Sequence, residues 1–413
     1  MTHSHYRKKF RFVKEMYSLP TSIKLISLVM FIYYIGWGIA TPYFPLFLKE
    51  VLGSYTAVGL VTGLLPLFSI LVYLFIGPLC DRVSKRKVVS LMLLLYLPYS
   101  FVLLGLKSII SFVYFRVYHA FIATSLWTAS DSYLREHSSK GKGAEAIGMY
   151  DSFYTFSLVI GPIIGAFLFM LYGYNIFYAI SAFALLAFFV SLRLHAKRGK
   201  RLFSGIRDML RDHFIKREFS DFMANKELVR ISLFVFLFYL GTSIIGMTVP
   251  LFLRSIDVDF FQIGLAIALF NVPWVFESYF STAKNKRKNI LLGIFFAIVL
   301  LFTMFFAKDL RTIAVILFLL GMCNAAVLPI IQGRITELMP KKEIGELVGV
   351  NNSIWNIATG FGPLFAGIFA DKFGLQPLFL VLAFLFLALL LIAHSSKSFY
   401  FEKSKLTDGV QKL

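Results

Sequence analysis

Three ionisable side chains, Arg116, Asp151 and Glu277, stand inside or at the edge of long apolar runs of the sequence. A charge at the middle of a bilayer costs about 2.5–3.5 kcal/mol on insertion scales, so such residues face a cavity or a partner and mark ion or substrate pathways. A carboxyl group withdrawn from water can load and release a proton near neutral pH. We therefore predict Asp151 as the protonation site, and we assign Arg116 and Glu277 to proton coupling with it.

Each carboxylate also has a structural interpretation. Asp151 could be the ion-pair partner of a cation at the same end of the bundle, such as Arg135. Glu277 could pair with Lys284 or Arg287, which follow it closely in the sequence. The sequence alone leaves both alternatives open.

Polar and aromatic side chains recur at helical spacing around these charges. Arg116, His119, Ala123, Trp127 and Asp131 fall on one helical face. Such faces could line a cavity for apolar or cationic organic molecules. The predicted substrate cavity comprises Tyr33, Trp37, Thr41, His119, Trp127, Thr155, Tyr239, Trp274, Asn352 and Asn356. Packing is the competing interpretation, since 17% of the chain is aromatic, and for His119 a hydrogen-bonded packing role is favoured over proton carriage.

The composition indicates that helices in a membrane must hold these residues. Of 413 residues 58% are hydrophobic and only 15% charged, with a mean hydropathy of +0.75, whereas soluble proteins carry about 25% charged residues. The apolar runs are continuous, which favours helices over a barrel. Twelve spans are predicted near residues 25–48, 57–79, 88–106, 111–134, 146–171, 174–193, 229–253, 260–282, 289–307, 312–337, 344–370 and 375–394.

The distribution of cations predicts the orientation. Most of the 42 Lys and Arg residues lie in alternate connecting segments, and such segments face the cytoplasm. The remaining loops hold Lys49, Lys107, Arg254, Lys308, Arg311 and Lys372. Both termini are therefore predicted to be cytoplasmic. The net charge of +20 is explained as a topological signal towards anionic lipid and not as a nucleic-acid interface.

The two halves of the chain repeat each other. FPLFLK, ending at Lys49, recurs as VPLFLR, ending at Arg254, and SKRK at 84–87 recurs as NKRK at 285–288. Glu145, Gly148, Ser152, Gly161 and Pro162 recur in order as Glu346, Gly349, Ser353, Gly362 and Pro363. This series predicts a duplicated six-span unit, as in many secondary transporters. The predicted organisation is an N-terminal six-helix half (1–193), a cytoplasmic linker (194–228) and a C-terminal half with a basic cytoplasmic tail (229–413).

The segment GPLCDRVSKRK between the second and third spans resembles the signature of the major facilitator superfamily, roughly G-x-L-x-D-R-x-G-R-[RK]. Gly77, Asp81, Arg82, Lys85 and Arg86 match it, and Ser84 stands where the family has a second glycine. The resemblance implies a cytoplasmic gate in which Asp81 locks against the start of the eleventh span. We add Asp131, close to the same rim, to this gate. The alternative is a charged loop that merely obeys the positive-inside rule.

Two further segments are similar to family patterns. Arg116 matches the arginine of the fourth-span pattern R-x-x-Q-G. Gly161, Pro162 and Gly165 partly match the fifth-span pattern of antiporting exporters, and Gly362 and Pro363 are their repeat partners. Glycine and proline permit bending and close helix packing, so these five residues are predicted to be bending points. The repeat also allows simple architectural symmetry as their explanation.

Taken with the repeat, the resemblance implies an all-α integral membrane protein of the major facilitator fold, most like the proton-coupled drug and multidrug exporters. We expect a monomer of the plasma membrane that exchanges protons for amphipathic or cationic small molecules by alternating access. A proton- or ion-coupled importer of a nutrient such as a sugar or amino acid is the alternative. A membrane sensor or scaffold without transport is a third interpretation.

Enzymatic chemistry is not expected. The sequence has no nucleotide-binding loop, no G-x-S-x-G elbow and no HExxH zinc motif. Cys80 and Cys323 lie in apolar runs and are interpreted as small buried hydrophobic residues. We therefore expect no cofactor and no metal.

Overall fold

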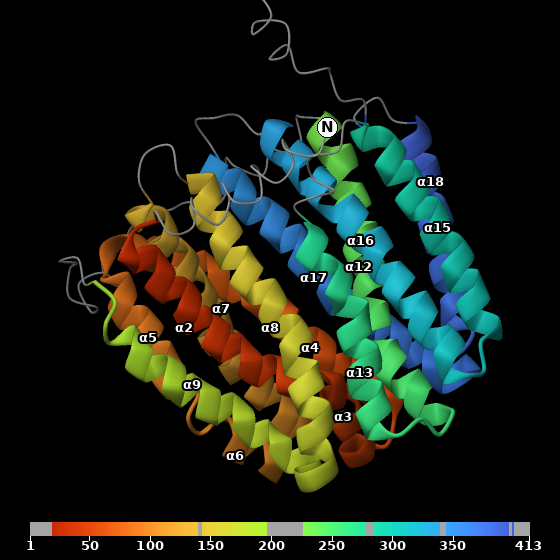
Figure 1. The fold of residues 1–413 in the computed structure, drawn as a ribbon, viewed down its shortest axis with the longest axis horizontal. Coiled ribbons are helices and arrows are strands. Elements are labelled where there is room, and N and C mark those ends of the chain that lie inside the picture. The colour runs from red at the N-terminus through yellow and green to blue at the C-terminus, as the bar shows by residue number, and fades with distance from the viewer. Residues whose placement is uncertain are drawn as a thin grey trace, which may run out of the picture.

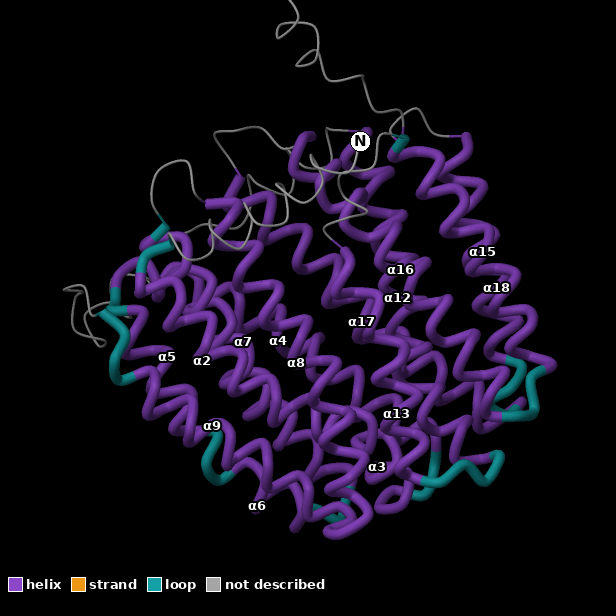
Figure 2. The backbone as a smooth tube through the Cα atoms, viewed as in Figure 1, coloured by secondary structure: helices purple, strands orange, loops and turns teal. Residues whose placement is uncertain are grey.

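The computed structural model describes residues 19–138, 143–195, 226–277, 285–338, 344–395 and 399. The side chains of residues 74, 78, 81, 144, 336–338 and 344–351 lie outside the description. The described chain is a bundle of long helices joined by short turns (Figures 1 and 2). In chain order its elements are α2 (Thr21–Ala40), η1 (Thr41–Tyr43), α3 (Phe44–Leu52), α4 (Tyr55–Arg82), α5 (Lys85–Leu95), α6 (Tyr99–Gly105), α7 (Ile109–His137), α8 (Gly143–Tyr172), η2 (Gly173–Phe177), α9 (Tyr178–Ser191), α12 (Lys226–Ser255), α13 (Phe260–Asn271), η3 (Val272–Phe276), α15 (Lys286–Phe306), α16 (Leu310–Leu338), α17 (Ile344–Phe373) and α18 (Leu378–Ser395).

The helices match the twelve predicted spans. Ten apolar segments in the described ranges are long enough to cross a membrane, and Phe260–Phe276 forms a shorter apolar helix. One of the ten, Glu145–Ser191, has 47 residues, about 70 Å of helix at 1.5 Å per residue. That length is more than twice a bilayer core of about 30 Å. The segment turns back at Gly173, whose φ of 53° suits glycine, so it supplies two spans, α8 and α9.

Three spans are interrupted where the sequence predicted continuous runs. A 3₁₀ turn containing Pro42 separates α2 from α3, and Pro98 precedes α6. The eighth span changes from α13 to the 3₁₀ segment η3, which contains Pro273. Proline lacks an N–H and so removes one hydrogen bond of the helical ladder. By contrast, Pro162 and Pro363, the predicted bending points, lie inside the single helices α8 and α17.

The linker predicted at 194–228 lies largely outside the described residues. Helix α9 ends at Ser191, and α12 already begins at Lys226. Residues 196–225 are not described, and the C-terminal tail beyond residue 395 is described only at Phe399. The domain boundaries therefore stay predictions.

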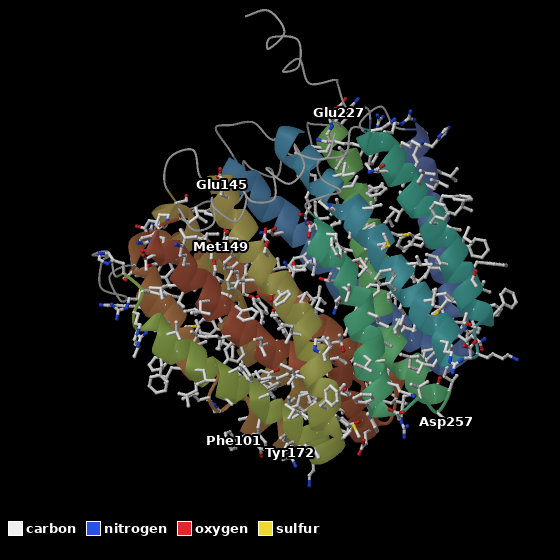
Figure 3. All side chains as sticks on the ribbon, viewed as in Figure 1. Phe101, Glu145, Met149, Tyr172, Glu227 and Asp257 are labelled. Atoms are coloured by element: carbon white, nitrogen blue, oxygen red, sulfur yellow. The ribbon has the colours of Figure 1, made fainter. Side chains whose placement is uncertain are left out.

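The helices form two groups that meet along two helix pairs. Figure 1 shows α2 to α9, in red to yellow-green, on one side, and α12 to α18, in green to blue, on the other. Across the boundary α4 packs along α17, and α8 packs along α13. We call the end where α4 finishes at Arg82 and α5 starts at Lys85 the basic end, and the opposite end, at Gly53 and Gly173, the distal end. In Figure 3 Glu145 and Glu227 lie at the basic end, and Tyr172 and Asp257 at the distal end.

Helix caps explain why several helices begin at the distal end. Ser54, Ser108, Asp259 and Asp309 each accept a hydrogen bond from a backbone N–H three residues later, at the starts of α4, α7, α13 and α16. A helix start leaves its first N–H groups without partners, and these side chains supply them. For Asp309, in the exposed turn before α16, the bond from the Thr312 N–H lowers the pKa of the carboxyl.

Glycine allows the two halves to touch near the distal end. A Cβ on Gly63 of α4 would lie 2.1 Å from the carbonyl oxygen of Gly360 in α17, and a Cβ on Gly59 would lie 2.1 Å from that of Pro363. Towards the basic end, Gly77, Gly148 and Gly333 meet nothing within 4 Å in the described part of the chain. The closest contacts between the halves therefore belong to the distal half of the bundle.

We predict that Gly63→Ala opens this contact, because the methyl group cannot fit against the Gly360 carbonyl. Overpacking of this kind costs about 1–3 kcal/mol. A cysteine placed at Leu67, whose side chain contacts Gly360, should react faster with an impermeant maleimide in the Gly63→Ala background. Gly246→Ala is the matched control, because Gly246 of α12 has open space around it. Equal labelling rates in all three backgrounds would contradict the prediction.

Candidate transport site

The first half contains a buried polar cluster around Arg116 of α7. Arg116 is 3% exposed and His119 is 2% exposed. The Arg116 Nε donates to the Val61 carbonyl oxygen at 2.8 Å, and its Nη1 lies 3.0 Å from His119 Nδ1. The guanidinium also lies 4.4 Å above the Phe44 ring. The intramembrane arginine therefore meets a backbone carbonyl, an imidazole and an aromatic face.

Aromatic residues of the first, third and fourth spans surround His119. The Trp37 ring stacks on the imidazole with centroids 4.9 Å apart, and the Tyr99 hydroxyl lies 3.1 Å from Nδ1. Trp37 Nε1 donates to the Tyr33 hydroxyl at 2.7 Å, and Tyr33 donates to Tyr96 at 2.7 Å. Tyr33, Trp37, Arg116 and His119, which the sequence assigned to the cavity and to proton coupling, thus form one cluster within the first half.

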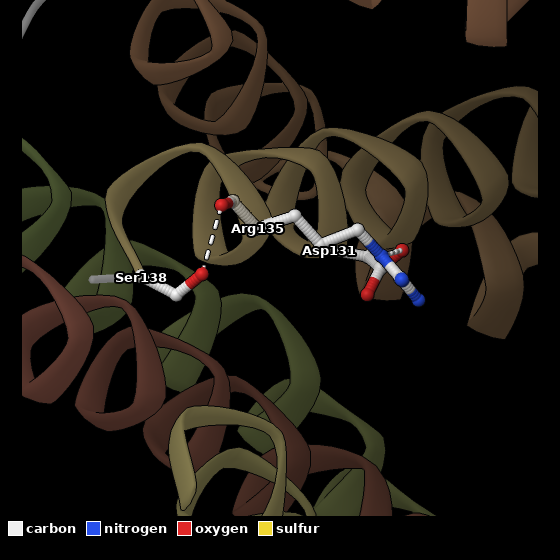
Figure 4. Close-up of polar contacts among 3 residues, drawn as sticks. All are labelled: Asp131, Arg135 and Ser138. Atoms are coloured by element: carbon white, nitrogen blue, oxygen red, sulfur yellow. Dashed lines mark hydrogen bonds and ion pairs between the residues drawn. The ribbon is translucent and has the colours of Figure 1, made fainter. Parts of the chain in front are cut away.

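Cations and carboxylates pair at the basic end. Arg135 Nε lies 2.8 Å from Asp131 Oδ2, and the Ser138 hydroxyl donates to the Arg135 carbonyl oxygen (Figure 4). Lys85 lies 3.2 Å from Glu136. Both residues of the Asp131 pair are substantially exposed, so the pair contributes at most about 1 kcal/mol. Arg135 is thus held by Asp131.

The other members of the predicted gate lie at the same end. Arg86 Nη2 donates to the Leu192 carbonyl oxygen at 2.6 Å, which ties α5 to the end of α9. Arg82 lies in the last turn of α4, and Gly77 lies in the same helix. The side chain of Asp81 and those around Ile344 fall outside the described residues, so the lock between them stays a prediction.

Asp151 of α8 lies on the side of the first half that faces the second. Its side chain is exposed, although α8 itself packs between α2 and α13. Its charge interacts with Asp131 and Arg135 in the same half and with Glu277 in the other. A carboxylate within reach of the opposite half points to the boundary between the halves and not outwards to lipid.

Four aromatic rings of the first half gather beside Asp151. Tyr34 lies 4.6 Å from Tyr154 and 5.9 Å from Trp127, measured between ring centroids. Trp127 in turn lies 6.0 Å from Tyr150 and 5.9 Å from Tyr154. Edge-to-face contacts at these distances hold the rings in fixed orientations.

The second half contributes Glu277 and its neighbours. Glu277 directly follows the 3₁₀ segment η3. Its charge interacts with Tyr154 of the first half and with Tyr239 of the second. Tyr239 accepts a hydrogen bond from Gln332 Nε2 at 2.9 Å and lies 5.8 Å from the Trp355 ring. We call the whole set the carboxylate–aromatic cluster; it comprises Tyr34, Trp127, Tyr150, Asp151, Tyr154, Tyr239, Glu277, Gln332 and Trp355.

The remaining predicted cavity residues are distributed along several helices. Thr41 donates to the carbonyl oxygen of Trp37 one turn earlier, and Asn356 donates to that of Asn352. Thr155 of α8 is buried, and Trp274 lies half-buried in η3. Their assignment to a substrate cavity stays a prediction.

Sequence reasoning missed Tyr34, Tyr150, Tyr154 and Gln332. One signal was available, because Tyr150 and Tyr154 lie one turn apart and flank Asp151 on α8. Tyr34 and Gln332 gave no such signal, because their partners come from other helices.

Two six-helix groups that meet through small residues, with ionisable groups turned towards their boundary, define a helical membrane transport protein. The profile of the Major Facilitator Superfamily matches residues 26–307 and 231–395. The chain belongs to this superfamily. It is therefore a multi-pass membrane transporter of a small molecule and not an enzyme.

Relatives and solved structures agree with this assignment. The chain is 23% identical over 366 residues to the multidrug resistance protein MdtG of Escherichia coli O9:H4 (strain HS), which covers 84% of this chain and 87% of the relative. Among solved structures, the nucleoside transporter NupG superposes with a TM-score of 0.71 at 13% identity, over 93% of this chain and 100% of that one. The human organic anion transporter MFSD10 (TETRAN) gives 0.64 at 16% identity, over 91% and 100%. These two likenesses show the fold.

We predict that Tyr33→Phe destabilises the protein without changing ligand affinity. The hydroxyl links Trp37 to Tyr96 inside the first half, so its loss leaves buried polar groups without a partner, at about 1–3 kcal/mol. Thermal unfolding in detergent should show a lower melting temperature, whereas Tyr114→Phe, at a 73% exposed position of α7, should melt like the wild type. Indistinguishable melting of the two variants would contradict this interpretation.

Proposed function

We propose that the protein exports amphipathic organic cations in exchange for protons, by alternating access between its two halves. The observation that carries the proposal is that Asp151 and Glu277, from opposite halves, share one electrostatic environment with a set of aromatic rings. Carboxylates attract a cation, and ring faces favour its organic part.

Competition for the carboxylates would couple the two fluxes. An ionised carboxylate binds an organic cation, whereas a protonated one has lost the attracting charge. A proton arriving at Asp151 or Glu277 therefore lowers the affinity for the cation, and cation binding favours release of the proton. Such mutual exclusion produces antiport when the site opens to one side at a time and changes sides only with a proton or a cation bound.

The proposed orientation places the basic end in the cytoplasm of the cell, in the plasma membrane, with both termini inside. Support comes from the cations of the loops, which concentrate at that end. Since the tight contacts between α4 and α17 lie towards the distal end, the described conformation is assigned to the state closed to the outside. We further propose that a monomer performs transport, because a single chain contains both halves of the candidate site.

The printed name of MdtG, a multidrug resistance protein, supports export of drug-like molecules. Import of a nutrient is the alternative function, and the transport experiment tests it with nucleosides, sugars and amino acids.

We predict that Asp151→Asn abolishes proton-driven uptake of tetraphenylphosphonium into proteoliposomes that contain the inverted protein. The amide keeps the size of the side chain and removes both the charge and the titratable proton. Asp257→Asn is the matched control, because it makes the same chemical change in the distal turn, where Asp257 has φ 61° and asparagine is tolerated. Transport should be retained in this control.

Full gradient-driven transport by Asp151→Asn would contradict the assignment of this carboxylate as the protonation site. Glu277→Gln, measured in parallel, reports whether the second carboxylate carries the proton instead. If the wild-type protein moves nucleosides, sugars or amino acids but not the cation, nutrient import replaces cation export as the proposed function.

We also predict that Trp127→Ala weakens equilibrium binding of tetraphenylphosphonium by about thirty-fold, the size of one desolvated cation–π contact of about 2 kcal/mol. Phe121→Ala is the control on the same helix, because Phe121 is 45% exposed and does not belong to the cluster. Its dissociation constant should equal that of the wild type. An unchanged dissociation constant for Trp127→Ala would show that the aromatic rings around Trp127 do not bind the cation.

A further inference from the structure

Asp371, near the end of α17, bonds to the start of a helix in the other half. Its Oδ1 accepts a hydrogen bond from the Tyr55 backbone N–H at 2.9 Å, and its Oδ2 accepts one from the Thr56 N–H at 2.7 Å. Tyr55 and Thr56 are the first two residues of α4. One carboxylate thus caps a helix that is more than 300 residues away in the sequence, across the boundary between the halves.

The cap completes the hydrogen bonding of this helix start. The first N–H groups of any helix have no partner within the helix. In α4 the helix's own N-cap, Ser54, accepts only from Ala57, and the first intrahelical bond runs from Val58 to the Ser54 carbonyl oxygen. Asp371 satisfies the two N–H groups that remain. A carboxylate also suits this position because a helix N-terminus carries partial positive charge.

Neighbouring groups hold Asp371 in register with α4. A Cβ on Gly367, one turn earlier in α17, would lie 2.2 Å from the Tyr55 carbonyl oxygen, so the backbones touch there. Lys49 donates to the Gly53 carbonyl oxygen, and its Nζ lies 3.9 Å from the Tyr55 ring centroid. Lys49 also interacts electrostatically with Asp371.

The repeat does not reproduce this arrangement. In the second half the corresponding helix, α13, is capped by its own Asp259 at Gln262. Since Gly362 and Pro363 correspond to Gly161 and Pro162, the position equivalent to Asp371 in the first half is Met170, which is 68% exposed. The connection is therefore specific to the α4–α17 pair.

We propose that Asp371 is the latch of the distal face: full capping of α4 depends on contact between the two halves, so capping energy favours the state closed at that end. When the halves separate there, Tyr55 and Thr56 lose their shared acceptor, and only Ser54 remains as a cap. The latch rests on the alternating-access part of the proposed function, and it does not require proton coupling or a particular substrate.

The test compares graded variants of the full-length protein. Asp371→Asn keeps one acceptor oxygen and so loses one of the two bonds, whereas Asp371→Ala loses both. Asp309→Asn is the matched control, because Asp309 caps α16 within a single half. Spin labels at Lys107 and Lys308, exposed in distal loops of the two halves, report the separation of the halves. Hydrogen exchange of the peptide that contains Tyr55 and Thr56 reports loss of the cap.

The latch predicts that the open-to-closed ratio at the distal end rises about ten-fold in Asp371→Ala, with Asp371→Asn between it and the wild type. Exchange at the start of α4 should accelerate in the same order, and Asp309→Asn should change neither measurement. Wild-type distances and exchange in folded Asp371→Ala would overturn the latch. If Asp371→Ala does not fold, Asp371→Asn decides by the same criteria. These measurements do not involve cation transport. The latch can therefore be wrong while the role of Asp151 is right, and the reverse.

Discussion

Every feature of this transporter depends on the requirement that polar groups in lipid find partners within the protein. Unpaired backbone groups cost several kcal/mol in a bilayer, so the described chain crosses it as helices, whose ladders satisfy themselves. Lipid tails are as apolar as leucine, hence helices associate through close packing and not through the hydrophobic effect. The contacts of Gly59 and Gly63 with α17, where backbones touch, are the result. The same requirement concentrates function at helix ends and at charges, because these are the groups that still need partners.

The two polar clusters satisfy this requirement in different ways. Around Arg116, partners come from one half only: the Val61 carbonyl oxygen, His119 and the Phe44 ring. That cluster can move as one body with its half. Around Asp151 and Glu277 the interacting groups come from both halves, so their environment changes whenever the halves move. Groups whose surroundings differ between two states are the ones that can couple binding to conformational change. This difference is why we propose the carboxylates as coupling groups and a structural role for Tyr33 within the Arg116 cluster. The coupling role of Arg116 stays a prediction.

Much of the fold was predictable because span length and charge placement are local properties of the sequence. The twelve spans, the repeat and the turn at Gly173 follow from apolar runs and short motifs. The breaks at Pro42, Pro98 and Pro273 were harder to predict from the sequence. Pro162 and Pro363 remain inside helices, so proline alone does not determine which helix breaks. The candidate site was predictable only in part. Asp151 and Glu277 stood out as charges in apolar runs, whereas Tyr34, Gln332 and the Asp371 cap depend on contacts between distant segments that no local pattern encodes.

In the proposed mechanism a proton and an organic cation compete for the carboxylates between the halves. The most direct measurement of this competition is proton release on ligand binding, recorded with a pH indicator in weakly buffered detergent solution as tetraphenylphosphonium is added. The account predicts release in proportion to bound ligand for the wild type, and none for the Asp151→Asn, Glu277→Gln double variant. Ligand binding by the wild type with no change in pH, over the range in which transport is driven by protons, would contradict the account.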